Sequence, residues 1–264
     1  MKRIIFSDVD GTLLNTNHEM TERTKNAILA AGERDIPFVI VSARSPSGIF
    51  SIMKEYGFNC PIAAYSGALI MDKDKNILCH KGMEKPIAAQ VIDCIESLGL
   101  DTAWNIFSVD EWVVKDKNDP RVLLEESVVK TYAKEGDINS VTDNLVNKIM
   151  CMCRPDEIGR AENMIKAAFP QLSVMRSSDI MIEVMEKGVT KAAAVEKLCE
   201  IWGVPIENTV AFGDNYNDVE MLKAAGKGFL MENAPSELKE KILLHAQSCD
   251  DDGVYFKLNE LNII

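Results

Sequence analysis

The sequence lacks several features that mark whole classes of protein. No stretch of about 18 uninterrupted apolar residues occurs in it, so we expect no membrane-spanning helix. The 15 Gly and 9 Pro follow no period, which excludes a collagen-like or low-complexity chain. Basic residues are outnumbered: 29 Lys and Arg stand against 41 Asp and Glu, a formal net charge of −12. Because a nucleic-acid surface needs clustered Lys and Arg, we expect no nucleic-acid partner.

The cysteines give no sign of a disulfide framework or a zinc site. There are seven, scattered along the chain, with no CxxC pair and no Cys/His spacing of the kind that binds zinc. Cys151 and Cys153 share one face of a strand-like run, which favours buried packing. The N-terminus is basic and then apolar, and its apolar part stops at Ser7, short of a signal-peptide core. We therefore expect reduced thiols and a cytoplasmic protein.

The residues that are present suit a globular chain with a core. The composition is 47% hydrophobic and 27% charged, as in soluble globular proteins. The length of 264 residues suggests one large domain or two moderate ones. Short apolar runs alternate with helical patterns near the N-terminus, a rhythm that predicts a parallel α/β sheet. The strands expected there are 4–6, 38–41 and 61–64, and the helices are 21–34 and 45–56.

The middle of the chain has a different rhythm. Adjacent strand-like runs mixed with helices are typical of an α+β unit with an antiparallel sheet, and the α/β rhythm resumes near residue 187. We therefore predict a Rossmann-like α/β core, residues 1–83 and 187–264, interrupted by an inserted α+β domain, residues 84–186. The helices expected beyond residue 83 are 86–98, 120–134, 157–168, 190–202, 218–225 and 234–245. The strands are 103–109, 111–115, 146–153, 173–176, 180–185, 209–212 and 228–231.

An acidic turn follows the first predicted strand. It reads Asp8-Val9-Asp10-Gly11-Thr12-Leu13. Two carboxylates two residues apart can address one point in space, and the glycine lets the backbone turn at once. An isolated DxDG is about equally consistent with a solvated turn, because Asp and Gly are ordinary turn residues.

A second acidic turn, Gly213-Asp214-Asn215-Tyr216-Asn217-Asp218, follows the strand at 209–212. The carboxyl ends of parallel strands meet at one edge of a sheet, so the two turns bring several carboxylates together. Such carboxylates repel one another unless a hard cation lies between them, and Mg²⁺ suits carboxylates, waters and a substrate phosphate. Asp218 taken alone could instead be a helix N-cap.

Two further segments offer groups for an anion. Lys191 begins a helix, where its charge is unfavourable with the helix dipole unless an anion lies nearby. Ser42 ends the strand at 38–41 and offers a hydroxyl and backbone N–H groups, and Arg44 could grip a phosphate. The alternative for Lys191 and Arg44 is an exposed position, which is usual for such residues.

In this order and spacing, the four segments resemble the four motifs of the haloacid dehalogenase superfamily over nearly the whole chain. The chain looks most like the Cof-like phosphatase branch, with its large inserted cap, and the segment Asp250-Asp251-Asp252-Gly253-Val254 is part of the likeness. The second motif departs from the usual Thr-Gly-Arg, but Ser42 keeps its hydroxyl. Ser66 stands where the family usually has Asn, which leaves substrate preference open.

The resemblance implies roles for the matching residues. Asp8 resembles the nucleophile that forms an aspartyl-phosphate, and Asp10 resembles the general acid that then serves as base. The phosphate-binding groups implied are Ser42, Lys191, Asn217 and Arg44. The Mg²⁺ ligands implied are Asp8, Asp214 and the backbone carbonyl of Asp10, and Asp218 would orient the metal site or the lysine.

The function implied is a Mg²⁺-dependent phosphatase of small phosphomonoesters, with sugar phosphates as the favoured class. The inserted domain would choose the leaving group; Glu183 is one candidate contact, and Trp104 and Trp112 are either stacking or core residues. Two alternatives stay open: a phosphomutase using the same aspartyl-phosphate, and a catalytically silent binding protein on this fold. We expect a small phosphorylated metabolite as partner, no membrane, and a monomer or homodimer.

Overall fold

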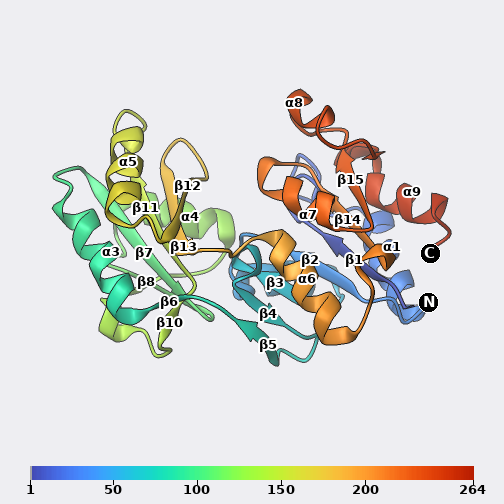
Figure 1. Ribbon diagram of the computed structural model, residues 1–264, viewed down its shortest axis with the longest axis horizontal. Coiled ribbons are helices and arrows are strands. Elements are labelled where there is room, and N and C mark those ends of the chain that lie inside the picture. The colour runs from blue at the N-terminus through green and yellow to red at the C-terminus, as the bar shows by residue number, and fades with distance from the viewer. Residues whose placement is uncertain (1) are drawn as a thin grey trace. The chain divides into compact units, whose positions relative to one another are not determined.

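The computed structural model describes residues 2–264, which divide into two compact units. The first comprises residues 2–43, 49–79 and 190–264, and the second comprises residues 44–48 and 80–189. In Figure 1 the first unit joins the blue N-terminal part of the chain to the orange and red C-terminal part. Most of the second unit is therefore one continuous stretch inserted between the two halves of the first.

One mixed sheet forms the centre of the first unit, with the strand order β16-β15-β14-β1-β2-β3-β4-β5 (Figure 1). Neighbours from β16 to β3 are parallel, and β4 returns antiparallel to β3. Every residue of β1, β2 and β14 is buried, as expected for apolar strands covered on both faces. The strands are β1 (Ile4–Ser7), β2 (Phe38–Val41), β3 (Ile62–Ala64), β4 (Leu69–Met71), β5 (Ile77–His80), β14 (Thr209–Gly213), β15 (Lys227–Met231) and β16 (His245–Ala246).

The parallel α/β core predicted from the sequence is confirmed, with two differences. β4, β5 and β16 extend the sheet at its edges, where the runs are too short to show a pattern. The helix expected at 234–245 is wrong, because α8 covers only Ser236–Lys239 and His245 pairs with Leu230 of β15. The helices of this unit are α1 (Glu22–Glu33), α2 (Pro46–Tyr56), α6 (Lys191–Trp202), α7 (Val219–Ala224), α8 (Ser236–Lys239) and α9 (Gly253–Glu260).

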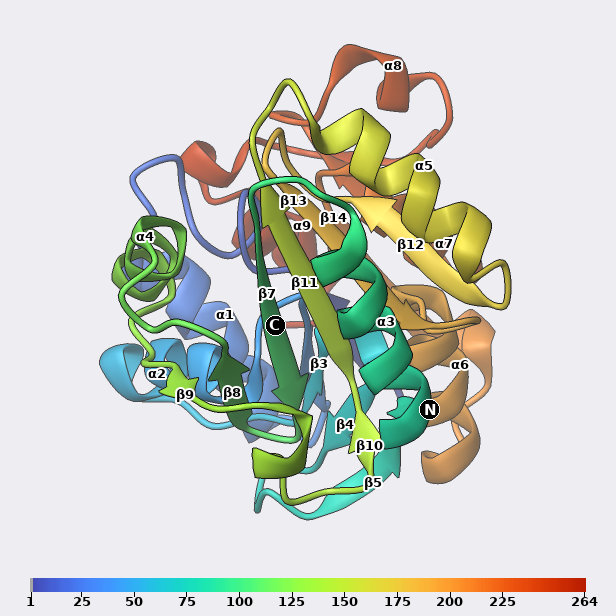
Figure 2. The same ribbon diagram turned by 90° about the vertical axis from the view of Figure 1, so that its left-hand side faces the viewer.

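The second unit contains a sheet in the order β12-β13-β11-β7-β8-β9, antiparallel except for the β8–β9 pair. Helices α3 (Lys85–Ser97) and α5 (Ile158–Ala168) lie side by side across one face of it, as Figure 2 shows. They bury alternate strand residues such as Ile106, Ile149 and Val184. The strands of this sheet are β7 (Thr102–Ser108), β8 (Glu111–Val114), β9 (Lys134–Glu135), β11 (Lys148–Cys153), β12 (Leu172–Arg176) and β13 (Met181–Glu186). Two further strands, β6 (Met83–Glu84) and β10 (Leu145–Val146), pair antiparallel in a separate two-stranded sheet.

The helix expected at 120–134 ends early. Helix α4 (Pro120–Val129) stops because Lys130 takes a left-handed conformation with φ 54°. Lys134 then pairs with Val113 as part of β9. Asp119 caps the start of α4 by accepting the backbone N–H of Arg121 at 2.9 Å, and Pro120 suits the first helical position.

The cysteines are free thiols, and Cys151 and Cys153 are buried on the face of β11 that α3 and α5 cover. The buried packing expected for this pair is what the structure shows. Within residues 2–264, no helix has the combination of length and apolar character that crossing a membrane demands.

The complete burial of the central strand β1 indicates that substitutions there should destabilise the protein strongly. Phe6 is fully buried between β14 and β2, so Phe6→Ala should leave a cavity. We expect this change to lower the free energy of unfolding by about 3–5 kcal/mol, measured by urea denaturation. Ile77, in edge strand β5 and 48% exposed, is the control, and Ile77→Ala should change that energy by about 0.5 kcal/mol at most. Equal losses in the two variants would contradict this account of the core.

Candidate active site

Three neighbouring strands of the first unit end at the same edge of the sheet. The residues that follow β14, β1 and β2 are Asp214, Asp8 and Ser42. β1 lies between the other two strands and pairs with both. The chain proceeds from β1 to β2 on one side and returns at β14 on the other, so the strand order reverses here. In open α/β sheets, ligands bind at the carboxyl ends of strands where the order reverses.

A buried lysine joins two aspartates at this edge. Lys191 Nζ lies 2.6 Å from Asp8 Oδ1 and 2.6 Å from Asp218 Oδ1. The lysine side chain is only 1% exposed, so its charge depends on these two partners. It is the first residue of α6, which Thr190 caps by accepting the backbone N–H of Ala193 at 3.1 Å.

Asp218 organises the second acidic turn. Its side chain is completely buried, and Oδ2 accepts the backbone N–H groups of Asp214 and Asn215, each at 3.0 Å. A Cβ on Gly213 would lie 2.5 Å from the Asp218 side chain, so only glycine leaves room for this arrangement. Asp218 therefore holds both the lysine and the turn that carries Asp214.

The first acidic turn is tied to the second through Thr12. Its Oγ1 donates a hydrogen bond of 2.9 Å to Asp214 Oδ1. Gly11 has φ +78°, and a Cβ there would lie 2.4 Å from Asp214 Oδ2. A positive φ and a close carboxylate both require glycine at this position.

The carboxylates form a group able to hold a cation. One oxygen from each of Asp8, Asp214 and Asp218 lies within 4.8 Å of the others. Both Asp218 oxygens bind N–H groups, whereas Asp8 binds Lys191 through Oδ1 and Asp214 binds Thr12 through Oδ1. An all-oxygen donor set of carboxylates fits Mg²⁺.

The pKa values show how unfavourable this cluster is without a cation. Burial raises the pKa of Asp8 to about 8; Lys191 opposes the shift, and Asp218 and Asp214 add to it. Burial likewise raises the pKa of Asp214 to about 6, with the Thr12 hydrogen bond opposing. Burial disfavours the charge on Lys191, but the two carboxylates beside it outweigh that effect and raise its pKa. A divalent cation would lower both aspartate pKa values.

The other four site residues predicted from the sequence differ from one another in burial and in their neighbours. Ser42 is 2% exposed, and its backbone N–H donates to the carbonyl of Ala63. Asn217 is exposed in the single helical turn Tyr216–Asp218. Asp10 lies close enough to Asp214 to help raise the pKa of that residue. Arg44 belongs to the second unit, where burial raises the pKa of Glu125 and the charge of Arg44 is among those that oppose this shift.

Some functional contacts were not foreseen in the sequence. Thr12 was quoted in the motif without a role, and its bond to Asp214 joins residues 202 positions apart, which no local spacing signals. The two tryptophans considered for stacking are core residues. Trp104 is 5% exposed and donates to Glu96, and Trp112 is 6% exposed and donates to Asn105.

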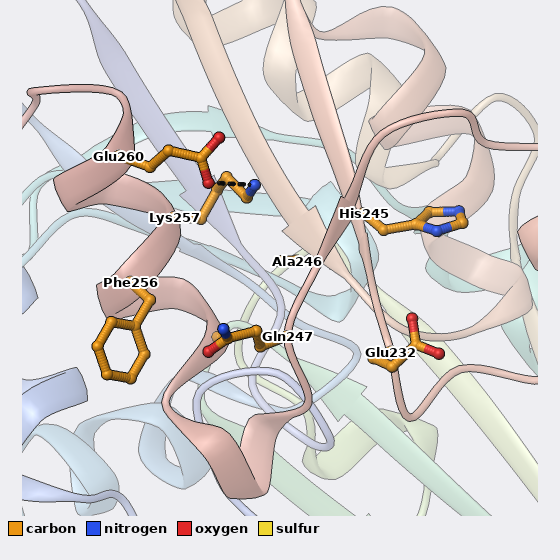
Figure 3. A pocket seen from close by; sticks show the side chains of 8 residues that line it. Glu232, His245, Ala246, Gln247, Phe256, Lys257 and Glu260 are labelled. Atoms are coloured by element: carbon orange, nitrogen blue, oxygen red, sulfur yellow. Dashed lines mark hydrogen bonds and ion pairs between the residues drawn. The ribbon is translucent and has the colours of Figure 1, made fainter.

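A pocket elsewhere in the first unit shares no lining residue with the aspartate cluster (Figure 3). Lys257 is engaged there by Glu260, with 2.6 Å between Nζ and Oε2. Glu232 adds a second carboxylate and is itself paired with Lys239. Because its one lysine is already neutralised, the pocket is poorly suited to a phosphate. The lining residues are Glu232, His245, Ala246, Gln247, Gly253, Phe256, Lys257 and Glu260.

Comparison with known proteins gives matches over nearly the whole chain. Residues 5–258 match the family model described as haloacid dehalogenase-like hydrolase. A Haemophilus influenzae protein named "Putative phosphatase" is 33% identical, with 98% of this chain and 98% of that protein covered. A Yersinia pseudotuberculosis protein named HMP-PP phosphatase is 26% identical, with 96% of this chain and 93% of that protein covered.

Among solved structures, the chain is similar to a haloacid dehalogenase-like hydrolase from Bacteroides thetaiotaomicron. The TM-score is 0.89 at 25% identity, with 99% of this chain and 100% of that chain covered. Both units of the present structure therefore have counterparts in one known fold.

The raised pKa of Asp214 predicts that the free energy of unfolding of the metal-free protein depends on pH. The folded state binds this proton more tightly than the unfolded state, whose carboxyl has the ordinary pKa of 3.8. That proton stabilises the folded state fully below about pH 3.8, and the stabilisation disappears as the pH rises through about 6. Asp214→Asn does not titrate, so its free energy of unfolding minus that of the wild type should grow between these pH values and then level off. Urea denaturation in chelator measures this difference, and a difference constant with pH would contradict the assignment.

Proposed function

The chain belongs to the haloacid dehalogenase-like hydrolase family, in its Cof-like phosphatase branch, and from that membership we propose a Mg²⁺-dependent phosphatase that works through an aspartyl-phosphate on Asp8. The observation that carries the proposal is the buried Lys191, bound at once to Asp8 and Asp218 beside Asp214. This arrangement supplies a nucleophile, a fixed positive charge and a place for a cation within one small region.

The first step is attack by Asp8 on the phosphorus of a phosphate monoester. Two anions must approach each other, so the barrier is largely electrostatic. Lys191 is already fixed against Asp8 and can neutralise a phosphate oxygen without moving far. Ser42 and Asn217 would add hydrogen bonds to the other oxygens. Mg²⁺ held by Asp8, Asp214 and the Asp10 carbonyl would supply the charge that keeps the nucleophile ionised.

Asp10 would act first as the general acid and then as the general base. In the first displacement the bond from phosphorus to the leaving oxygen breaks, and Asp10 protonates that oxygen. In the second, Asp10 takes a proton from water, the water oxygen bonds to phosphorus, and the bond to Asp8 breaks, releasing inorganic phosphate. Splitting hydrolysis in this way is ordinary covalent catalysis.

For the leaving group we propose a sugar or another polyol, and the support lies within the second unit. Lys148 Nζ is 2.9 Å from Glu183 Oε1 and 5.0 Å from the centre of the Phe107 ring. Glu183 lies opposite Met150 in the β11–β13 pair, so Lys148 and Glu183 occupy the sheet face that α3 and α5 leave uncovered.

A second carboxylate lies near this pair. Burial raises the pKa of Glu125, Lys148 lowers it, Glu183 raises it further and Arg44 lowers it, so four charged groups interact here. Carboxylates accept hydrogen bonds from hydroxyl groups and an ammonium donates to them, which fits a neutral polyhydroxyl group. Lys148 and Arg44 balance the two carboxylates, so the group as a whole carries no net charge, which suits a neutral leaving group.

Hydrolysis of p-nitrophenyl phosphate tests the reaction class. With Mg²⁺ present the wild type should release p-nitrophenol, and excess chelator should abolish the release. Asp8→Asn should lower kcat by more than about 1,000-fold, because no other residue takes over as nucleophile. Asp10→Asn should lower kcat for a hexose phosphate by about 100- to 10,000-fold. Full turnover by Asp10→Asn at neutral pH would show that its acid/base role is wrong.

The same assay separates the alternatives. A hexose phosphate converted to an isomer without release of inorganic phosphate would identify a phosphomutase. A wild-type protein with no hydrolysis of any phosphomonoester in Mg²⁺ would favour a binding protein.

A second experiment tests the leaving-group proposal. Glu183→Gln should lower kcat/KM for hexose phosphates by about 10-fold or more, because one charged acceptor is lost, and should leave p-nitrophenyl phosphate hydrolysis nearly unchanged. Glu162→Gln is the matched control, since Glu162 also pairs with a lysine in the second unit, Lys166, at 2.6 Å. Equal effects of the two variants on hexose phosphates, or no effect of either, would reject a role for Glu183.

A further inference from the structure

One exposed side chain joins three loops of the first unit. Asn233 lies two residues beyond the end of β15. Its Nδ2 donates a hydrogen bond of 2.8 Å to the carbonyl of Gly11, and its Oδ1 accepts the backbone N–H of Cys249 at 3.0 Å. A carboxamide can donate and accept at the same time, which neither a carboxylate nor an alkyl side chain can do.

We propose that Asn233 is a positioning residue, which holds the turn carrying Asp8 and Asp10 in the conformation that phosphoryl transfer needs. The inference rests on the phosphatase function proposed above and adds a residue that none of the four motifs contains. Asn233 would act through the backbone of Gly11 and would not itself touch the substrate.

The topology explains how so distant a residue reaches the turn. The sheet order runs β16-β15-β14-β1, and these strands are parallel, so their following loops gather at one edge. Asp8 follows β1 and Asp214 follows β14. Asn233 and Cys249 come after the next two strands, so each strand on this side of β1 contributes to the same group of loops.

Gly11 is the residue of the turn whose peptide group is bound by a side chain from another loop. It separates Asp10 from Thr12, whose hydroxyl holds Asp214. With φ +78° and no side chain, Gly11 does not itself restrict how its peptide group is oriented. Two hydrogen bonds orient this peptide group: the N–H of Thr12 donates to the Val9 carbonyl at 3.3 Å, and Asn233 donates to the Gly11 carbonyl from another loop. Through Gly11, Asn233 therefore helps to set where Asp10 and Thr12 point.

The C-terminal segment reinforces the same stretch of chain. Asp250, next to Cys249, accepts both the backbone N–H and the hydroxyl of Thr16, each at 2.9 Å. Asp252 accepts from Arg23 at 3.3 Å and also contacts the Thr21 hydroxyl. These aspartates lie in the segment that resembles the family, and the proposed reaction assigns them no chemical step. In this structure they anchor the chain that follows the catalytic turn.

Two substitutions distinguish the two hydrogen bonds that the Asn233 side chain makes. Asn233→Ala removes both, whereas Asn233→Asp keeps an acceptor for Cys249 but sets a carboxylate against the Gly11 carbonyl. We expect each variant to lower kcat for p-nitrophenyl phosphate by about 10- to 100-fold, the usual loss when a supporting hydrogen bond is removed. KM should change by less than about threefold, because the phosphate-binding side chains stay in place. Calorimetric titration with Mg²⁺, without substrate, should show affinity about 10-fold weaker.

The control is Asn259→Asp, which adds the same charge and also removes a donor to a backbone carbonyl, that of Tyr255 at 3.1 Å. It should keep wild-type kcat, Mg²⁺ affinity and melting temperature. If Asn233→Ala keeps kcat and Mg²⁺ affinity within twofold of the wild type, the inference is overturned. A fall in melting temperature that accounts for the lost activity would also overturn it, because the role would then be structural. An inactive wild type would instead reject the phosphatase proposal, so the two failures can be told apart.

Discussion

The site depends on one buried charge, the ammonium group of Lys191. A buried lysine without partners costs several kcal/mol, and here two carboxylates at 2.6 Å offset that cost. One of them, Asp218, also binds the backbone of the turn that carries Asp214. The lysine is 183 residues from Asp8 and 27 from Asp218, so a single ion-paired group fixes segments that are far apart in sequence. Removing either carboxylate would leave the lysine charge only partly compensated.

The same region carries more negative than positive charge. Lys191 faces Asp8 and Asp218 with Asp214 alongside, and burial makes each ionised carboxylate more costly. This imbalance is unfavourable for the isolated protein, and in the proposed reaction it would attract a cation and so prepare the site for a phosphate dianion. Positive charge drawn in by the aspartates offsets the approach of a second anion. The electrostatic cost of this cluster and the role proposed for it thus have one physical origin.

The sequence predicted the parts of this arrangement that local rules govern. Buried strands followed by acidic residues indicated the sheet edge, and an unfavourable lysine in a first helical turn indicated a nearby anion, which proved to be Asp8 and Asp218. Contacts that depend on the tertiary structure left no such signal. Thr12, Asn233 and the edge strand β16 fall in this class, because single polar residues and two-residue strands show no periodicity. The helix expected at 234–245 was wrong for the same reason: apolar spacing could not show that His245 pairs with β15.

The most direct test of the account is to trap the phosphorylated residue. With p-nitrophenyl phosphate, whose leaving group needs no acid, the Asp10→Asn variant should form the aspartyl-phosphate and hydrolyse it slowly. Acid quenching, reduction with borohydride and peptide mass spectrometry then identify the modified position, since reduction of an aspartyl-phosphate yields homoserine. The account predicts homoserine at position 8 and nowhere else, and only after incubation with substrate and Mg²⁺. Phosphate release with an unmodified residue 8, or with the modification at another aspartate, would contradict it.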